Sequence, residues 1–180
     1  MKAILTSMTA VAVLVAPACA QSQADAPTTS PAFAATTGMW RAMTGHFTTA
    51  AEEGSDSLYA FRPVEGVRSF GELVGHVAGA QYMFCAIALG EEVPDEGAVE
   101  EAAKSKAELV AALKASTEYC NRAYALPDAQ LAAPVTIFGQ ANTRMGALAM
   151  NSNHNAEHYG NVVVYLRLNG IVPPSSRRGM

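Results

Sequence analysis

The chain has 180 residues, of which half are hydrophobic and 16% are charged. Its 12 Lys and Arg residues against 16 Asp and Glu residues give a formal net charge of −4. This length suits one domain with a substantial core and argues against two domains. Because nucleic-acid binding needs a basic surface, the acidic balance predicts no nucleic-acid partner.

The first twenty residues predict a secretory signal peptide. Lys2 is followed by a short apolar stretch and then by the small residues Ala18-Cys19-Ala20. This order is typical of a signal peptide, and the apolar stretch is too short to span a bilayer. The alternative is an apolar N-terminal helix packed on the domain. With no later stretch expected to cross a membrane, we expect an exported protein, periplasmic or secreted.

Residues 21–31 are polar, contain Pro and have no hydrophobic period, so they predict a flexible leader. A single domain is expected over residues 32–176. Its first helix should run from about Ala32 to Glu53. The residues expected to face the core on this helix are Met39, Met43, Phe47 and Ala50.

Three further helical patterns follow. Ser69 and Ser105 each precede a Glu by three residues, the spacing of a capping box, and should open the second and third helices. We expect the second helix to stop at Gly90 and the third near residues 126–127. Residues 133–142 should form an extended connection. Thr143 then caps a fourth helix that runs to Asn169. Four helical patterns without alternating strands predict an all-α bundle.

The fourth helix carries a His-x₃-His pair, His154 and His158. Both share a line with apolar residues such as Ala147 and Val162, so they should face the core. The neighbouring positions Asn151, Asn155 and Arg167 are polar, so we expect them to lie on the outward side of this helix. Burying an imidazole without a partner costs several kcal/mol, and metal coordination removes that cost. His-x₃-His on a helix can place both nitrogens on one ion.

His76, on the inward side of the second helix, is the best candidate for a third ligand. Taken alone, such a residue can equally be a hydrogen-bonded core histidine. Neutral imidazoles suit one divalent transition metal ion, Zn, Ni, Fe(II) or Cu, and the sequence does not distinguish among them. His46 on the first helix could be a fourth ligand, a pocket wall or a surface residue.

Four motifs in order resemble the DinB-like family of small metal-binding four-helix bundles. They are residues 59–63 (YAFRP), 69–76 (SFGELVGH), 153–160 (NHNAEHYG) and 165–174 (YLRLNGIVPP). The resemblance covers residues from about Phe33 to Ser176. It implies one His from the second helix and an H-x₃-H pair from the last, which map onto His76, His154 and His158. It also implies an up-down-down-up bundle with a long crossover between the second and third helices.

In that implied topology the second and third helices are parallel. Cys85 lies 16 residues past Ser69, and Cys120 lies 15 past Ser105, so the two cysteines would sit at nearly equal height. In an exported protein such a pair could form a disulfide. The alternative is two buried thiols that act as small hydrophobic side chains.

Several members of the family are thiol transferases or thiol-dependent isomerases, in which the metal activates a low-molecular-weight thiol. This chain has HYGN at residues 158–161 where the common family ending is HRGQ, so the Arg and Gln of that ending are replaced by Tyr159 and Asn161. We therefore expect a metal-dependent hydrolase or thiol-transferase-like enzyme with an open coordination position and a small-molecule substrate.

Four further residues complete the expected site. Glu157 could act as general base or as an outer partner of the ligands, or it could be a solvated carboxylate. Gln81, Asn151 and Asn161 could line the mouth of the site or simply face water. A non-catalytic metal- or ligand-binding module is the second hypothesis, and a structural bundle without metal is the third. The chain could also form a homodimer.

Overall fold

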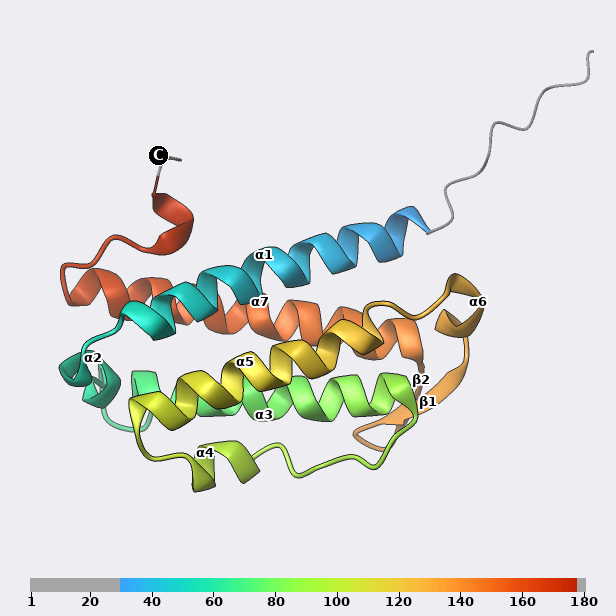
Figure 1. Ribbon diagram of the computed structural model, residues 1–180, viewed down its shortest axis with the longest axis horizontal. Helices are drawn as coiled ribbons and strands as arrows, with labels where there is room; N and C mark the ends of the chain where they lie inside the picture. The colour runs from blue at the N-terminus through green and yellow to red at the C-terminus, as the bar shows by residue number, and fades with distance from the viewer. Residues whose placement is uncertain (1–29, 178–180) are drawn as a thin grey trace, which may run out of the picture.

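The computed structural model describes residues 30–177, and the chain there is mostly helical. Four long helices lie side by side (Figure 1): α1 (Pro31–Glu53), α3 (Phe70–Leu89), α5 (Lys106–Ala123) and α7 (Arg144–Leu168). The shorter elements are α2 (Asp56–Ala60), α4 (Ala98–Ala102), α6 (Asp128–Leu131), a 3₁₀ turn η1 (Pro174–Ser176), and the strands β1 (Pro134–Ile137) and β2 (Gln140–Thr143). The predicted signal peptide and residues 21–29 of the leader lie outside the described residues.

The helix starts follow from local sequence. Ser69 and Ser105 each accept a hydrogen bond from the backbone N–H three residues on, and Glu72 and Glu108 reciprocate. Both predicted capping boxes are therefore present. Thr143 likewise caps α7 through the N–H of residue 146. At the start of α1 a proline, placed in the predicted leader, occupies the first helical position, where its missing N–H costs nothing.

One expectation of secondary structure was wrong and a second was incomplete. The helix α5 ends at Ala123, three residues before Leu126, and the chain turns into α6 instead. The connection expected to be extended over residues 133–142 does contain extended backbone, as β1 and β2, but the two strands pair as an antiparallel hairpin that was not predicted. Phe138 and Gly139 form its two-residue turn, both with positive φ (49° and 76°), as such tight hairpin turns require.

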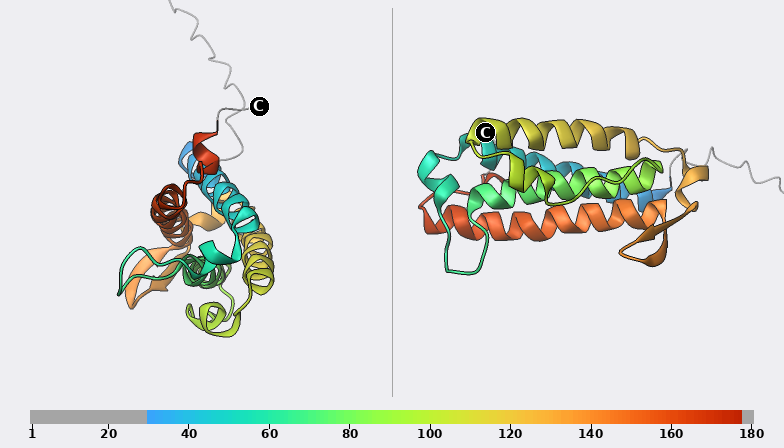
Figure 2. Two further views of the ribbon diagram at one scale, coloured as in Figure 1. Left: turned by 90° about the vertical axis from the view of Figure 1, so that its left-hand side faces the viewer. Right: turned by 90° about the horizontal axis from the view of Figure 1, so that it is seen from below.

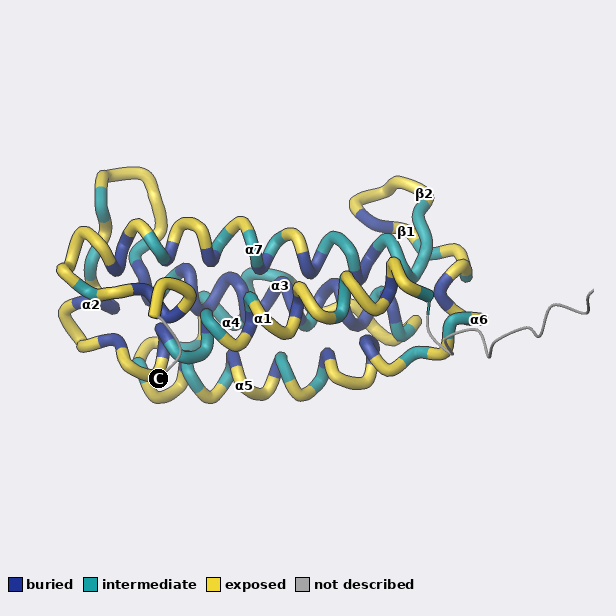
Figure 3. Tube along the Cα trace, turned by 90° about the horizontal axis from the view of Figure 1, so that it is seen from above, coloured by how far each residue is buried: buried dark blue, intermediate teal, exposed yellow. Residues whose placement is uncertain are grey.

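The long helices form a closed set of neighbours, visible end-on in Figure 2. The central helix α3 packs against α5 and α7, and α1 packs against the same two helices. Contacts advance in the same sense along α3 and α5, from Gln81–Ser116 to Cys85–Cys120. Between α2 and α3 a loop leaves the bundle at one end, and the hairpin projects at the other (Figure 3).

The helix α3 is apolar because it is the core helix. By length and composition it could cross a membrane, with a mean hydropathy of 1.3, so the expectation that no stretch after the signal would pass that test was wrong. Within the domain 78% of this segment is buried against its neighbours. Its predicted core positions, Leu73, Val77, Ala80 and Phe84, are all buried.

The buried face of α1 agrees with the expected one at Phe47 and Ala50, which are buried, and differs from it at Met39. Met39 is 52% exposed, whereas Trp40 beside it is 1% exposed. The Trp40 ring stacks on Tyr124 with ring centroids 4.0 Å apart, and its indole nitrogen donates to Gln81. A large aromatic ring with a buried hydrogen-bond acceptor therefore sets the rotation of α1, and the methionine lies outside.

The buried face of α7 also differs from the expected one. Asn151 and Asn155, assigned to the outward side, have no exposed surface. Their amides lie at the centre of the buried face, between Leu148 and Val162. As a result, the two histidines of α7 lie on the flank of that face and are only partly buried. His158 lines a cavity from this flank, whereas the side chain of His154 is only 16% exposed.

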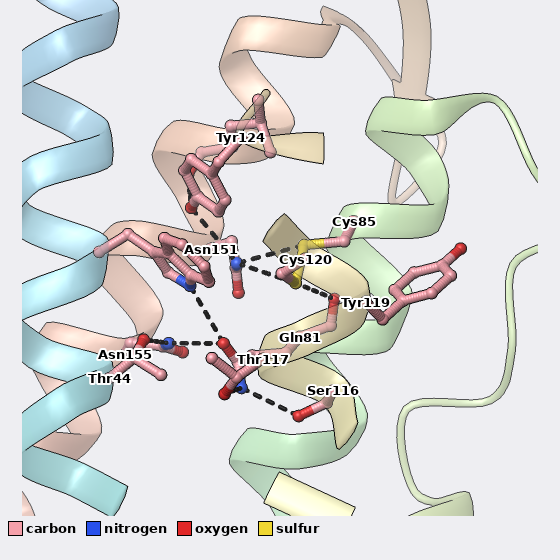
Figure 4. Close-up of a disulfide and its surroundings, with 12 residues drawn as sticks. Thr44, Gln81, Cys85, Ser116, Thr117, Tyr119, Cys120, Tyr124, Asn151 and Asn155 are labelled. Carbon is pink, nitrogen blue, oxygen red and sulfur yellow. Dashed lines mark hydrogen bonds between the residues drawn. A yellow bond between two sulfur atoms is a disulfide. The ribbon is translucent and has the colours of Figure 1, made fainter. Parts of the chain in front are cut away.

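A layer of buried polar side chains links all four long helices (Figure 4). Gln81 accepts from Trp40 Nε1 at 3.0 Å and from Asn155 Nδ2 at 3.2 Å, and it donates to Ser116 at 3.0 Å. Asn155 also donates to Thr44 at 2.9 Å. Because an unmatched buried amide is costly, this layer favours one register of the helices over the others.

A disulfide joins Cys85 of α3 to Cys120 of α5, with the two Cα atoms 5.4 Å apart (Figure 4). Both residues are fully buried, and the side-chain nitrogen of Asn151 lies 3.5 Å from the Cys85 sulfur. The bond closes a loop that contains the whole crossover between α3 and α5.

The crossover returns along α3 in close contact with its backbone. A methyl group built on Gly79 would lie 1.9 Å from the backbone oxygen of Glu96, and one on Gly75 would lie 2.9 Å from the Cα of Glu100. Glycine at these two positions, one helical turn apart, is therefore what allows the crossover to touch α3.

We expect the disulfide to be formed in native protein purified without reductant, where alkylation and mass spectrometry should find Cys85 and Cys120 unmodified. Replacing both cysteines with alanine should lower the free energy of unfolding by about 2–4 kcal/mol, because the crosslink restricts the unfolded chain. Two alkylatable thiols in the native protein would contradict this prediction.

Gly79→Ala should displace the crossover and lower the free energy of unfolding by about 1–3 kcal/mol, as overpacking does. Gly45→Ala is the matched control, since a methyl at this exposed position in α1 would meet nothing within 4 Å beyond its chain neighbours and the backbone of its own helix. It should raise stability by up to about 1 kcal/mol. Urea titration measures both, and equal effects would disprove the close contact.

Candidate metal centre

The structure brings three histidines together at one point. His76 comes from α3, and His154 and His158 come from successive turns of α7. Their Nε2 atoms are 3.1 Å apart for His76–His154, 3.2 Å for His76–His158 and 3.0 Å for His154–His158. Three ring nitrogens thus form a nearly equilateral triangle between two helices.

The triangle fits the donor spacing around a transition metal ion. Nitrogens about 2.0–2.1 Å from an ion are about 3.3–3.4 Å apart in a tetrahedral arrangement and about 2.8–3.0 Å apart at right angles. The observed separations lie between these limits. The three Nε2 atoms lie within hydrogen-bonding distance of one another, but one ring nitrogen of a neutral imidazole cannot both donate and accept, so the three contacts cannot all be hydrogen bonds. The three histidines could therefore hold one metal ion.

Burial keeps these imidazoles neutral. The side chains of His76 and His154 are 11% and 16% exposed. Burial lowers the pKa of His76 to about 4, with a further contribution from the positive charge of Arg68. Burial also lowers the pKa of His154 to about 3, together with the neighbouring imidazoles. For His158 burial again lowers the pKa, and the charge of Glu157 opposes this effect. Neutral rings are the form that binds metal.

The outer nitrogens of the three rings have different surroundings. His76 Nδ1 lies 3.7 Å from Glu96 Oε1 and 4.0 Å from Glu100 Oε2, both on the crossover. His158 Nδ1 lies 3.4 Å from the side-chain amide of Asn161. The buried Nδ1 of His154 makes no hydrogen bond among the described residues. A ligating histidine usually donates its outer N–H to such a carboxylate or amide.

A cavity of about 540 Å³ adjoins the histidine triad, that is His76, His154 and His158, and is lined by His158. Its walls come from the loop between α2 and α3, from the first turn of α3, from α4 of the crossover and from α7. The polar and charged residues in these walls are Arg62, Arg68, Glu72, Glu100, His158 and Asn161. Two guanidinium groups therefore face a space that reaches one of the three histidines.

The other predicted site residues lie in different places. Asn161 lines the cavity, as one of the two sequence hypotheses had it. Gln81 and Asn151 are fully buried in the polar layer, so the expectation that they line the mouth was wrong. His46 stacks on Tyr159 at 5.4 Å and is not part of the histidine cluster. Glu157 is exposed on α7.

Three residues near the triad were missed by sequence reasoning: Arg68, Glu96 and Glu100. Arg68 is one residue before the α3 capping box, and its Nε lies 3.1 Å from both carboxylate oxygens of Glu100. Glu96 and Glu100 belong to an acidic, proline-containing connection that looks like an ordinary solvated loop. The available signal was the glycine pair at 75 and 79, which flanks His76.

Comparison with known proteins places the chain in a family. The model of the DinB superfamily matches residues 35–162. The chain belongs to the DinB superfamily. This membership agrees with the resemblance of the four sequence motifs and with the mostly helical fold. No curated protein matches the sequence.

Solved structures share the DinB fold. A DinB-like protein from Bacillus subtilis is 23% identical with a TM-score of 0.63, and the match covers 81% of this chain and 99% of that one. A DinB-like protein from Bacillus cereus is 15% identical with a TM-score of 0.67, covering 77% and 93%. A mycothiol-dependent maleylpyruvate isomerase is 16% identical with a TM-score of 0.61, and 72% of this chain matches 60% of that protein.

We expect the purified protein to bind one divalent transition metal ion per chain. His76→Ala, His154→Ala and His158→Ala should each weaken binding by more than about 100-fold, because two imidazoles remain where three converged. His46→Ala is the matched control and should bind like the wild type. Competition with a chromophoric chelator measures the affinities. Unchanged binding in all three variants would contradict the site.

Proposed function

We propose that this DinB-superfamily protein is an exported metal-dependent enzyme, a hydrolase or a transferase, that acts on a small molecule. His76, His154 and His158 would hold one divalent ion, Zn, Ni or Fe. The observation that carries the proposal is the triangle of three Nε2 atoms 3.0–3.2 Å apart, placed beside an open cavity.

The chemistry follows from three neutral ligands. When bound to imidazoles alone, a divalent ion keeps its full charge and supplies Lewis acidity toward a substrate oxygen or a water. The residues of the chain hold and orient the substrate. Arg68 and Arg62 line the cavity wall, each ion-paired with a glutamate of the same wall, and their remaining guanidinium N–H groups would donate to the substrate. Asn161 offers an amide next to His158. Val67 and Leu73 give the same cavity an apolar side.

We further infer the up-down-down-up connectivity of four helices and export from the cell. Contacts that advance together along α3 and α5 support the first inference, as do contacts in the opposite sense between α3 and α7, from His76–His158 to Cys85–Asn151. The disulfide supports the second, since such bonds persist in oxidising compartments. The apolar N-terminal stretch that ends at Ala20 is consistent with it.

One observation favours a non-catalytic metal-binding module as the second candidate. Glu96 Oε1 lies 4.0 Å from His154 Nε2, so a small movement could bring a carboxylate into the coordination sphere. Four protein ligands would give a closed site of the kind that stores or senses metal. X-ray absorption of the metal-loaded protein distinguishes the two, because an open site shows a water oxygen that exogenous ligands replace.

We expect the metal-loaded protein to turn over a member of a panel of esters, amides, phosphoesters and thiol acceptors with a low-molecular-weight thiol. Activity should disappear with a chelator, return with the metal and be lost in His154→Ala. His46→Ala should retain it. A metal-loaded protein with no exchangeable ligand position and no turnover would overturn the enzymatic proposal and leave the binding module.

A further inference from the structure

Glu96 is the charged group of the crossover that lies nearest the histidine triad. Its Oε1 is 3.7 Å from His76 Nδ1 and 4.0 Å from His154 Nε2. The carboxylate therefore faces two of the three histidines at once. In the turn that carries Glu96, the Asp95 carboxylate accepts from the backbone N–H of Gly97 at 2.7 Å and fixes the local backbone.

The position of Glu96 is set by its main chain. The backbone oxygen of Glu96 lies in the space that a side chain at Gly79 would fill, and the Cα of Glu100 lies close to Gly75. His76 stands between these two glycines on α3. The backbone of the crossover is thus held against α3 on both sides of His76. This contact places the side chains of Glu96 and Glu100 next to the His76 ring.

The two carboxylates of the crossover are not equivalent. Both oxygens of Glu100 are engaged by the guanidinium of Arg68. Among the described residues, the ion pairs formed by Lys and Arg include none with Glu96. Its side chain is 31% exposed, and among the described residues the basic groups within 4.0 Å of it are His76 and His154. The carboxylate of Glu96 is therefore available to accept a hydrogen bond from a histidine of the triad.

We propose that Glu96 is a positioning residue of the metal centre, which accepts the Nδ1–H of His76 and holds its Nε2 toward the ion. This inference rests on the proposed three-histidine site. A contact of 3.7 Å is longer than a hydrogen bond, and rotation of the partly exposed carboxylate about its side-chain torsions closes the difference. Such an acceptor fixes the ring tautomer and orientation and makes the ligand more basic, and its loss typically costs 10–100-fold in metal affinity.

The test compares Glu96→Ala, Glu96→Gln and Glu96→Asp with Glu92→Gln, an exposed carboxylate of the same crossover. Zn²⁺ affinity is measured by chelator competition, the ligand sphere by the Co²⁺ absorption spectrum, and the unfolding midpoint on metal-free protein. Glu96→Ala should weaken Zn²⁺ binding about 10–100-fold. Glu96→Gln and Glu96→Asp should lie between it and the wild type. Glu92→Gln should not differ from the wild type.

A second readout separates positioning from a merely structural role. In the Zn²⁺-loaded protein, the Nδ1 proton of His76 should give a downfield NMR resonance that Glu96→Gln moves upfield, with the metal-free unfolding midpoint unchanged. Wild-type affinity in Glu96→Ala would overturn this inference alone, and so would a fall in the metal-free midpoint that matches the loss of affinity. Loss of a ligand from the Co²⁺ spectrum of Glu96→Gln would make Glu96 a ligand instead. Failure of the wild type to bind Zn²⁺ or Co²⁺ would overturn the metal site as well.

Discussion

The convergence of three imidazole nitrogens from two helices is the constraint on which the rest of this structure depends. Desolvation makes the rings neutral, but it also makes each one costly unless its nitrogens are satisfied. Because His154 and His158 are fixed one turn apart on α7, only the packing of α3 against α7 decides whether His76 meets them. Separations of 3.0–3.2 Å allow little error in the register of these two helices.

The buried polar layer provides that register. An apolar interface tolerates sliding, because one methyl contact replaces another, whereas an amide that slides loses its partner. Asn155 follows a triad residue directly on α7 and hydrogen bonds to Gln81, which lies five residues after His76 on α3. A displacement that separated the histidines would also break this bond. The disulfide then fixes α3 to α5 near the same level of the bundle.

The sequence was sufficient for the long helices and for the His-x₃-His pair, because both depend on local signals, whereas the meeting of His76 with that pair depends on the packing of α3 against α7. Capping residues and the His-x₃-His spacing act within one or two helical turns. It was insufficient where the burial of a residue differs from what its type suggests. Asn151 and Asn155 were assigned to the surface by residue type, and Met39 was preferred to Trp40 on one helical line. The burial of Asn151, Asn155 and Trp40 depends on partners from other helices, and the pattern of a single helix contains no information about those partners.

The carboxylates beside the triad could not be predicted for a related reason, since a crossover has no periodicity to orient its side chains. Their electrostatic effect is nevertheless large. A divalent charge held by three neutral rings in a partly buried place needs compensation. The charge of Glu100 is matched by Arg68, so Glu96 alone would offset a part of it. On the side of the cavity, Glu72 is likewise paired, with Arg62, and does not offset the charge of the ion. The metal centre would therefore remain positive on that side. A residual positive charge at the end of a polar cavity favours the developing negative charge of an attacked carbonyl or phosphoryl group, which is the electrostatic condition for hydrolysis or group transfer.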